Sequence, residues 1–207
     1  MHILYEIPMF SLEKKHIPLL VINSLVIIFF TLQFIAEQNH EFLLYVVSVI
    51  IFATVITLTH QFVKYSMPVL CLLSVWIFVH LAWWALTHDG IIWYEKMLFP
   101  ISTTYNLIRY DQVIHMFGFF TATILSYEIL KNQLKPWKLN VWSLTIIMMA
   151  GCGFGALNEV IEFFVDQNVA TSWVGWYINT SVDLVVNLIG SFLWVIFIKT
   201  VLENKSA

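Results

Sequence analysis

Six long apolar segments, joined by shorter polar connections, constrain the fold of this chain more than any other feature. A helix needs roughly 20 mostly apolar residues to cross the hydrocarbon core of a bilayer. Of the 207 residues, 60% are hydrophobic and 11% are charged, more apolar surface than a soluble domain of this size can bury. The sequence therefore predicts one all-α membrane domain over residues 1–207, a polytopic bundle of six transmembrane helices. The expected helices cover residues 18–36, 42–63, 68–87, 111–130, 141–165 and 181–201.

Basic residues fall mainly on one side of this expected bundle. The positive-inside rule places short basic connections in the cytoplasm. If the N-terminus is cytoplasmic, only Lys96 and Arg109 lie outside, and the other eight of the ten basic residues lie inside. We therefore expect both termini to be cytoplasmic. The sequence has no basic block of the kind that binds nucleic acid, so the lipid bilayer is the expected partner.

Three polar stretches interrupt the apolar segments of the C-terminal half. Each places polar side chains three or four residues apart, which is the spacing of one helix face. Because hydrocarbon penalises a charged side chain by about 3 kcal/mol, these faces are expected to meet protein and each other. In the expected topology all three lie within about 10 Å, or two turns, of the outer surface. The stretches are residues 110–115 (Tyr-Asp-Gln-Val-Ile-His), 158–162 (Asn-Glu-Val-Ile-Glu) and 183–190 (Asp-Leu-Val-Val-Asn-Leu-Ile-Gly).

Small residues continue the same faces deeper into the membrane. Small side chains let helix backbones approach closely in lipid. The simplest arrangement is therefore one interface shared by the fourth, fifth and sixth helices, with an acidic, histidine-containing pocket at its outer end. The small residues on these faces are Gly118, Ala122, Gly151, Gly155, Gly190 and Ser191.

The residue types in this pocket favour a divalent cation or acid–base chemistry. One imidazole among carboxylates suits Mg²⁺ or Mn²⁺ better than Zn²⁺, which prefers more histidine or cysteine ligands. Such a metal would polarise a phosphoryl oxygen or activate water. Without a metal, the carboxylates and the imidazole would serve as acid and base. The candidate catalytic and metal-ligating residues are Asp111, His115, Glu159, Glu162 and Asp183.

Three further residues are candidates for binding a substrate. Arg109 and Tyr105 come just before the fourth helix, and Asn187 lies one turn after Asp183. An arginine grips a phosphate or carboxylate with two parallel hydrogen bonds, and Asn187 would orient the neighbouring acidic groups. The outer connections are rich in aromatic residues, which favour the headgroup zone, and we expect them to form a lid.

Each of these residues also has a purely structural explanation. Buried polar pairs fix helix packing through hydrogen bonds between helices. Asp111 would cap the start of its helix, and Arg109 would anchor the chain to lipid headgroups. His80, close to two tryptophans, is better explained as a packing residue than as a ligand. Three polar pairs at one depth favour a functional site over these separate explanations.

Taken in order, the three motifs resemble those of the VanZ-like family of small multi-pass bacterial membrane proteins. The shared pattern is Asp-x-x-x-His at residues 111–115, a glycine-rich helix that ends near Glu162, and Asp-Leu-x-x-Asn-x-x-Gly at residues 183–190. The chain departs from that pattern where Glu162 replaces a common glutamine, and it lacks an arginine before the sixth helix. It is also similar to YjdF-like inner-membrane proteins, in which Glu-x-x-Glu is followed by an aromatic residue, here Phe163.

The resemblance covers residues 110–190 and implies a protein of the bacterial cytoplasmic membrane with a link to the cell envelope. One VanZ-like member is associated with teicoplanin resistance. A first hypothesis is an enzyme that hydrolyses or transfers a lipid-linked or amphiphilic envelope substrate on the outer side, with metal assistance. A second is a non-catalytic protein that binds envelope lipids, antibiotics or partner proteins. A transporter ranks third, because it would need broken helices and a site at the membrane midplane.

Overall fold

Six long helices make up most of the structure. The structure, a computed structural model, describes residues 13–88, 91–102, 107–134, 136–168 and 177–206. Within them, five helices are long and apolar enough to cross a membrane, and α3 is a shorter apolar helix. The chain is therefore an all-helical, multi-pass membrane protein. The helices are α1 (Ile17–Ala36), α2 (His40–Val63), α3 (Met67–Ala85), α4 (Tyr110–Gln133), α5 (Val141–Asn168) and α6 (Tyr177–Ser206), with a 3-10 turn at Lys14–His16 before α1.

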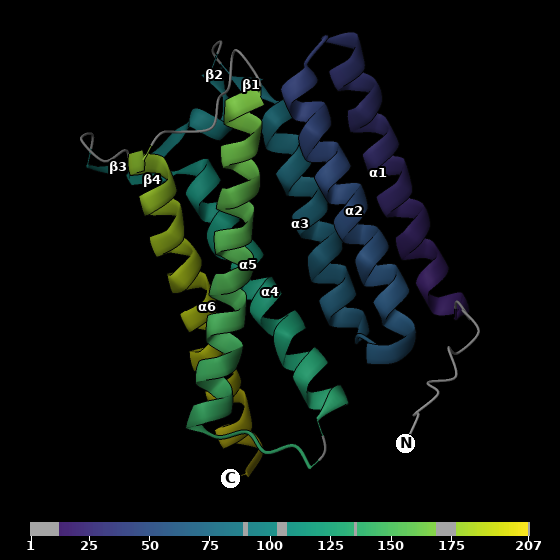
Figure 1. Cartoon of the computed structure of the whole chain (residues 1–207), viewed down its shortest axis with the longest axis vertical. Helices are drawn as coiled ribbons and strands as arrows, with labels where there is room; N and C mark the ends of the chain where they lie inside the picture. Colours follow the sequence, from purple (N-terminus) through teal and green to yellow (C-terminus); the bar gives the residue numbers. More distant parts are fainter. Residues whose placement is uncertain (1–12, 89–90, 103–106, 135, 169–176, 207) are drawn as a thin grey trace.

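The helices form two groups (Figure 1). Helices α1, α2 and α3 lie on one side of the molecule, and α4, α5 and α6 lie on the other. The start of α1 and the end of α6 are at the same end of the bundle. The starts of α4 and α6 and the end of α5 are at the opposite end, so the polar stretches predicted to meet are at one depth.

Two short hairpins lie between α3 and α4, where the sequence predicted only an aromatic loop. Strand β1 (Thr87–His88) pairs with β2 (Ile91–Ile92), and β3 (Met97–Ser102) pairs with β4 (Leu107–Arg109), both antiparallel. A 3-10 turn, η2 (Trp93–Glu95), separates them. Because Thr87 enters a strand, α3 ends at Ala85 and not at residue 87. The hairpins place η2 and the end of β4 beside the first turn of α4.

Helix starts follow from local chemistry. Pro18 and Pro68 occupy the first turns of α1 and α3, where a missing backbone N–H costs nothing. The Asn39 side chain accepts a hydrogen bond from the Phe42 backbone N–H (3.2 Å) and caps α2. The backbone N–H of Arg109 donates to the Gln112 side chain (3.1 Å) at the start of α4. Asp111 therefore lies inside the first turn of α4 and is not its cap residue.

Glycines allow close contact between α4, α5 and α6. A Cβ at Gly155 would lie 2.8 Å from Asn187 Nδ2, and one at Gly151 would lie 2.8 Å from Ser191 Oγ. A Cβ at Gly190 would collide with the backbone carbonyl oxygen of Met116. Gly118 is different, because it packs against Trp76 of α3. The prediction that Gly118 shares the interface of α4, α5 and α6 was therefore wrong.

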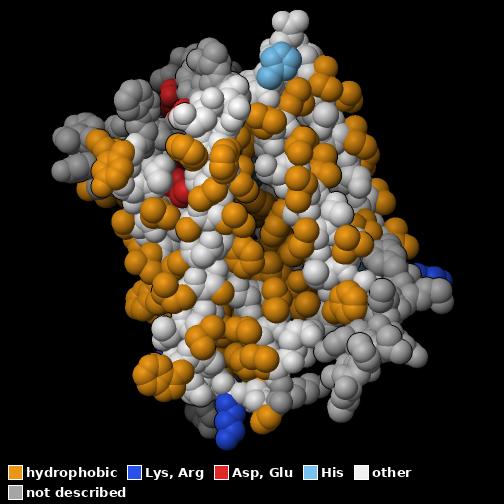
Figure 2. All heavy atoms as spheres, viewed as in Figure 1, with side chains coloured by type: hydrophobic (Ala, Val, Ile, Leu, Met, Phe, Trp, Pro, Cys, Tyr) orange, Lys and Arg blue, Asp and Glu red, His pale blue; other side chains and the backbone are white. Residues whose placement is uncertain are grey.

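The outer surface suits lipid. Large apolar side chains are exposed along the helices, among them Leu25 (61%), Leu32 (62%) and Phe164 (61%). Figure 2 shows hydrophobic side chains spread over most of one face of the bundle. An apolar surface of this extent is unfavourable in water and favourable against hydrocarbon.

Candidate metal site between α4, α5 and α6

One histidine and two carboxylates, each from a different helix, meet inside the bundle. His115 of α4, Glu159 of α5 and Asp183 of α6 each offer one ligand atom, and these atoms all lie within 4.8 Å of one another. All three side chains are buried. The glycines of α5 and α6 position this group, because only a close approach of the backbones brings short side chains from three helices together.

Several polar atoms of this group lack hydrogen bonds. Within the part of the chain that the structure describes, neither carboxylate oxygen of Glu159 accepts a hydrogen bond of normal geometry, although the side chains of Thr180 and Asn158 lie near them, and Asp183 Oδ1 has no hydrogen-bond partner. The same holds for Asn187 Nδ2. A buried polar atom left unsatisfied costs about 1–3 kcal/mol. The two oxygens of Glu159 and Asp183 Oδ1 lie beside an imidazole. Together they form a set of metal ligands, and a bound cation would satisfy them.

The imidazole of His115 lies between two glutamates of α5. Its Nδ1 atom is 3.7 Å from Glu159 Oε1 and 3.3 Å from Asn187 Oδ1. Its Nε2 atom is 3.6 Å from Glu162 Oε1. Glu162 is held in turn by Asn158, whose Nδ2 donates to Oε1 at 2.7 Å. Glu162 is therefore placed behind the imidazole, as carboxylates that orient metal-bound histidines commonly are.

A polar chain connects the start of α4 with the start of α6. The Arg109 guanidinium forms an ion pair with Asp111 and donates to Asn179 Oδ1. Asn179 Nδ2 donates to Asp183 Oδ2 at 2.5 Å. The other oxygen of Asp111 accepts from the Gln112 backbone N–H at 2.7 Å. Among the described residues, Asp111 is linked to Asp183 of the ligand group through Arg109 and Asn179.

Tyr94 of η2 supports Arg109 from outside the helices. The guanidinium carbon lies 5.3 Å from the centre of the Tyr94 ring, a cation–π contact. Burial lowers the pKa of Arg109, but the charge and hydrogen bond of Asp111, together with smaller contributions that include the charge of Asp183, outweigh burial and raise the pKa above its ordinary value. Burial, and then the charges of Glu162 and Asp111, raise the pKa of Tyr94 well above 10. Arg109 thus stays charged and Tyr94 stays a neutral phenol.

The structure brings most of the predicted site residues to one end of the bundle. His115, Glu159 and Asp183 form the ligand group, with Asn187 next to it, whereas Glu162 contacts the far side of the imidazole. Two of the other predicted residues stand apart from the group. Asp111 and Arg109 are paired with each other, and Tyr105 lies outside the described residues.

Two asparagines were missed by sequence reasoning. Asn179 bridges Arg109 and Asp183, and Asn158 holds Glu162. Asn179 lies four residues before Asp183 and so shares its helix face. That spacing was a usable signal, but α6 begins at Tyr177 and not at residue 181, so Asn179 was assigned to a loop.

An apolar cavity adjoins the site. It has a volume of about 130 Å³ and lies between α2, α3, α4 and α5, with Asn158 in its wall. Figure 2 shows the apolar face hollowed between α2 and α5. His80 also lines the cavity and stacks on Trp76, with ring centres 4.9 Å apart, which agrees with a packing role. Asn158 therefore connects the apolar cavity with the polar group, since its side chain bonds Glu162.

Comparison with known proteins identifies a family. A family described as "Predicted membrane protein (DUF2238)" matches residues 17–204, which include all six helices up to the last residues of α6. No match was found among curated proteins or among solved structures. The matched description does not itself confirm the VanZ-like or YjdF-like resemblance of the motifs. The chain belongs to the DUF2238 family of membrane proteins.

Proposed function

We propose that this protein is a metal-dependent membrane enzyme that hydrolyses or transfers a lipid-linked or amphiphilic substrate of the bacterial cell envelope. The observation that carries the proposal is the buried group of His115, Glu159 and Asp183, whose ligand atoms lie within 4.8 Å of one another. A packing role alone would leave the oxygens of Glu159 without hydrogen bonds of normal geometry, at a cost that a bound cation removes. The motif resemblance to YjdF-like and VanZ-like proteins supports a bacterial envelope setting.

The proposed topology has six spans, with both termini cytoplasmic and the metal site facing outward. At 1.5 Å per residue, the 19 residues of α3 extend about 28 Å, close to the thickness of the hydrocarbon core. Lys14, Lys64 and Lys131 lie at the end of the bundle opposite the site. The positive-inside rule assigns that end to the cytoplasm.

Each residue of the proposed site would have its own role. His115 would bind Mg²⁺ or Mn²⁺ through Nδ1, with one oxygen each from Glu159 and Asp183, because Nδ1 is the ring nitrogen on the side of Glu159 and Nε2 lies against Glu162. Glu162 would accept the Nε2 proton and fix the ring. The metal would polarise the scissile phosphoryl or carbonyl group and lower the pKa of a bound water. Asp111 would hold Arg109, which faces the outer end of the site.

The adjoining cavity supports an amphiphilic substrate. Its wall is apolar except for a few side chains, and one of those, Asn158, bonds Glu162. A hydrocarbon chain in this cavity would bring its polar headgroup toward the carboxylates. Ser48→Phe, which narrows the cavity from α2, is expected to raise KM for such a substrate with little change in kcat.

The proposal is tested by metal content and affinity. Purified wild-type protein is expected to bind about one Mn²⁺ per chain. Loss of a residue that only orients a metal ligand weakens metal binding by about 10-fold or more, so Glu159→Gln, which removes a ligand, is expected to weaken binding at least 10-fold. Glu95→Gln is the matched control, because Glu95 is exposed and lies at the same end of the bundle. Equal binding by both variants, or negligible metal in the wild type, would remove the metal site.

Activity is tested with reconstituted protein and a panel of phosphate-ester and diphosphate lipids. Product is expected with wild-type protein and Mn²⁺, and not with Glu159→Gln at matched reconstitution. Metal binding without turnover on any member of the panel would leave the protein a metal-stabilised binder and contradict the enzymatic part of the proposal.

A non-catalytic scaffold is the second candidate. It is favoured by the chain from Asp111 through Arg109 and Asn179 to Asp183, which connects α4 and α6 through one ion pair and hydrogen bonds without a metal. A scaffold predicts that Glu162→Gln lowers thermal stability but preserves the cellular phenotype at matched expression. Loss of the phenotype with unchanged stability would count against it. A transporter ranks lower, because α4 and α5 continue without a break through the polar region.

A further inference from the structure

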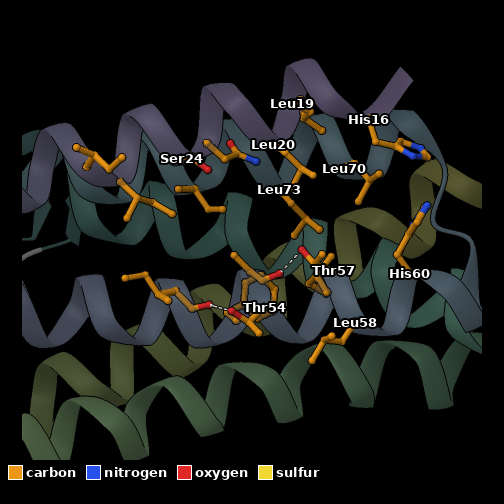
Figure 3. A pocket seen from close by; sticks show the side chains of 18 residues that line it. His16, Leu19, Leu20, Ser24, Thr54, Thr57, Leu58, His60, Leu70 and Leu73 are labelled. Carbon is orange, nitrogen blue, oxygen red and sulfur yellow. Dashed lines mark hydrogen bonds between the residues drawn. The ribbon is translucent and has the colours of Figure 1, made fainter. Parts of the chain in front are cut away.

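A second cavity lies between α1, α2 and α3. It has a volume of about 480 Å³, and none of His115, Glu159 and Asp183 lines it. Figure 3 shows its lining from close by: leucines such as Leu19, Leu70 and Leu73 lie along it, and His16 and His60 stand together at one end. The cavity is thus a long apolar groove with an imidazole pair at its mouth.

Three of the four ring nitrogens of this imidazole pair lack a hydrogen-bond partner among the described residues. Their ring centres are 4.6 Å apart with the planes nearly perpendicular. His16 is only 4% exposed, yet neither of its ring nitrogens has a hydrogen-bond partner among the described residues. The same is true of His60 Nδ1 within the described part of the chain. A bound group with oxygen acceptors at the mouth would remove this cost.

Three polar side chains inside the groove, unlike the three ring nitrogens at its mouth, have hydrogen-bond partners in the protein. Asn23 Nδ2 donates to Ser74 Oγ at 2.9 Å. The hydroxyls of Thr54 and Thr57 donate to backbone carbonyls of their own helix at 2.8 and 2.7 Å. These polar groups are already bonded, so the interior suits a hydrocarbon chain and the mouth suits a headgroup.

The end of the bundle that holds the mouth is mainly basic. Lys15 forms an ion pair with Glu13 at 2.7 Å, and the hydrogen bond from Lys15 lowers the pKa of Glu13, so that pair is neutral overall. The lysines at this end still outnumber the acids, which favours a ligand with negative charge. The described lysine and glutamate side chains there are Lys14, Lys15, Lys64, Lys131, Lys138 and Lys199, against Glu13 and Glu128.

We propose that this groove binds one anionic phospholipid. An acyl chain lies along the apolar wall, and the phosphate accepts hydrogen bonds from His16 and His60. Anionic lipids are attracted electrostatically to basic segments at a membrane surface. The site is separate from the proposed metal site, since it lies at the other end of the bundle and on the other group of helices (Figure 1).

The test is photo-crosslinking in nanodiscs with two probes that share one diazirine-labelled acyl chain, phosphatidylglycerol and phosphatidylcholine. The phosphatidylglycerol probe is expected to label peptides of α1 and α2 at least 5-fold more than the phosphatidylcholine probe. His16→Ala/His60→Ala is expected to abolish that preference. Ser24→Phe, which fills the groove without touching either imidazole, is expected to reduce labelling by both probes.

Two control variants complete the experiment. His40→Ala removes a histidine from the far end of α2. Leu25→Phe enlarges an exposed side chain that follows Ser24 in α1 but does not line the groove. Both lipid probes should label these two variants as they label the wild-type protein. Equal labelling by the two lipids, labelling indifferent to Ser24→Phe, or a crosslinked dimer of this chain joined through α1 would overturn the proposal.

Discussion

The two groups of helices bury different kinds of side chain. In α1, α2 and α3 the interior is aromatic and aliphatic, with Phe34, Phe42 and Leu81 almost fully enclosed. In α4, α5 and α6 the interior holds Asp111, Asp183 and other polar groups in contact with one another. The first group packs mainly through shape complementarity, whereas the second also needs partners for a cluster of polar groups.

The two kinds of interior contribute differently to the stability of the fold and to the proposed function. An apolar interface in lipid gains mainly van der Waals contact, because the hydrocarbon around it is equally apolar. A buried cluster of carboxylates adds a penalty that folding alone does not require. Three polar residues are also buried in or next to the first group, namely His16, Glu41 and His80, but the three-residue ligand group of His115, Glu159 and Asp183 lies between α4, α5 and α6, and the proposed chemistry is assigned to it.

The largest expected effect comes from Arg109→Met. The change leaves the fully buried Asp111 without its ion-pair partner, and breaking such a pair costs about 3–5 kcal/mol. Denaturant titration in detergent measures the loss. Lys96→Met is the control, since Lys96 only contacts the Trp93 ring near the surface, and it should cost about 1 kcal/mol or less. Equal effects would show that the Arg109 pair adds nothing to stability.

Gly190→Ala is expected to come next. The new Cβ meets the backbone carbonyl oxygen of Met116, which cannot move without shifting α4, so the cost is about 3 kcal/mol. Gly153→Ala is the matched control, because a Cβ there meets nothing within 4 Å. That change should be neutral or stabilise the protein by up to about 1 kcal/mol. A tolerated alanine at Gly190 would contradict the close packing of α4 and α6.

Leu81→Ala probes the apolar half. Leu81 has no exposed surface, so the substitution leaves a cavity that should cost about 2 kcal/mol in thermal unfolding. Leu25→Ala, at an exposed position of α1, should cost less than half as much. Metal binding should be unchanged in both variants. If Leu81→Ala weakened Mn²⁺ binding as Glu159→Gln does, the two halves would not be functionally separate.

His80→Phe is expected to have the smallest effect. The ring stacks on Trp76 and would be replaced by one of similar shape, at a cost below about 1.5 kcal/mol. Calorimetric titration with Mn²⁺ should give the wild-type affinity. A 10-fold loss of affinity would make His80 part of the site and extend the polar half into α3.

Hydropathy predicted the membrane bundle because each helix must present apolar side chains to lipid along its whole length. The spacing of His115, Glu159 and Asp183 could suggest a shared depth, but not their mutual distances, which depend on the contacts of Gly155 and Gly190. Asn179 was missed because its helix begins in polar sequence that resembles a loop.

The loop between α3 and α4 was the least predictable region. Its two hairpins are only two to six residues per strand, too short for an alternating pattern to emerge from an aromatic-rich sequence. Arg109 was expected to contact a substrate or lipid headgroups, yet its guanidinium bonds Asp111 and Asn179. Those partners depend on the fold of this loop, and no local spacing reveals them.

Pulsed electron paramagnetic resonance of bound Mn²⁺ tests the central claim most directly. Coordination by His115 predicts coupling to one imidazole nitrogen in the wild-type spectrum. That coupling should be kept in His80→Phe and should disappear in His115→Gln. Bound Mn²⁺ with no nitrogen coupling, or coupling that survives the loss of His115, would contradict a metal site between α4, α5 and α6.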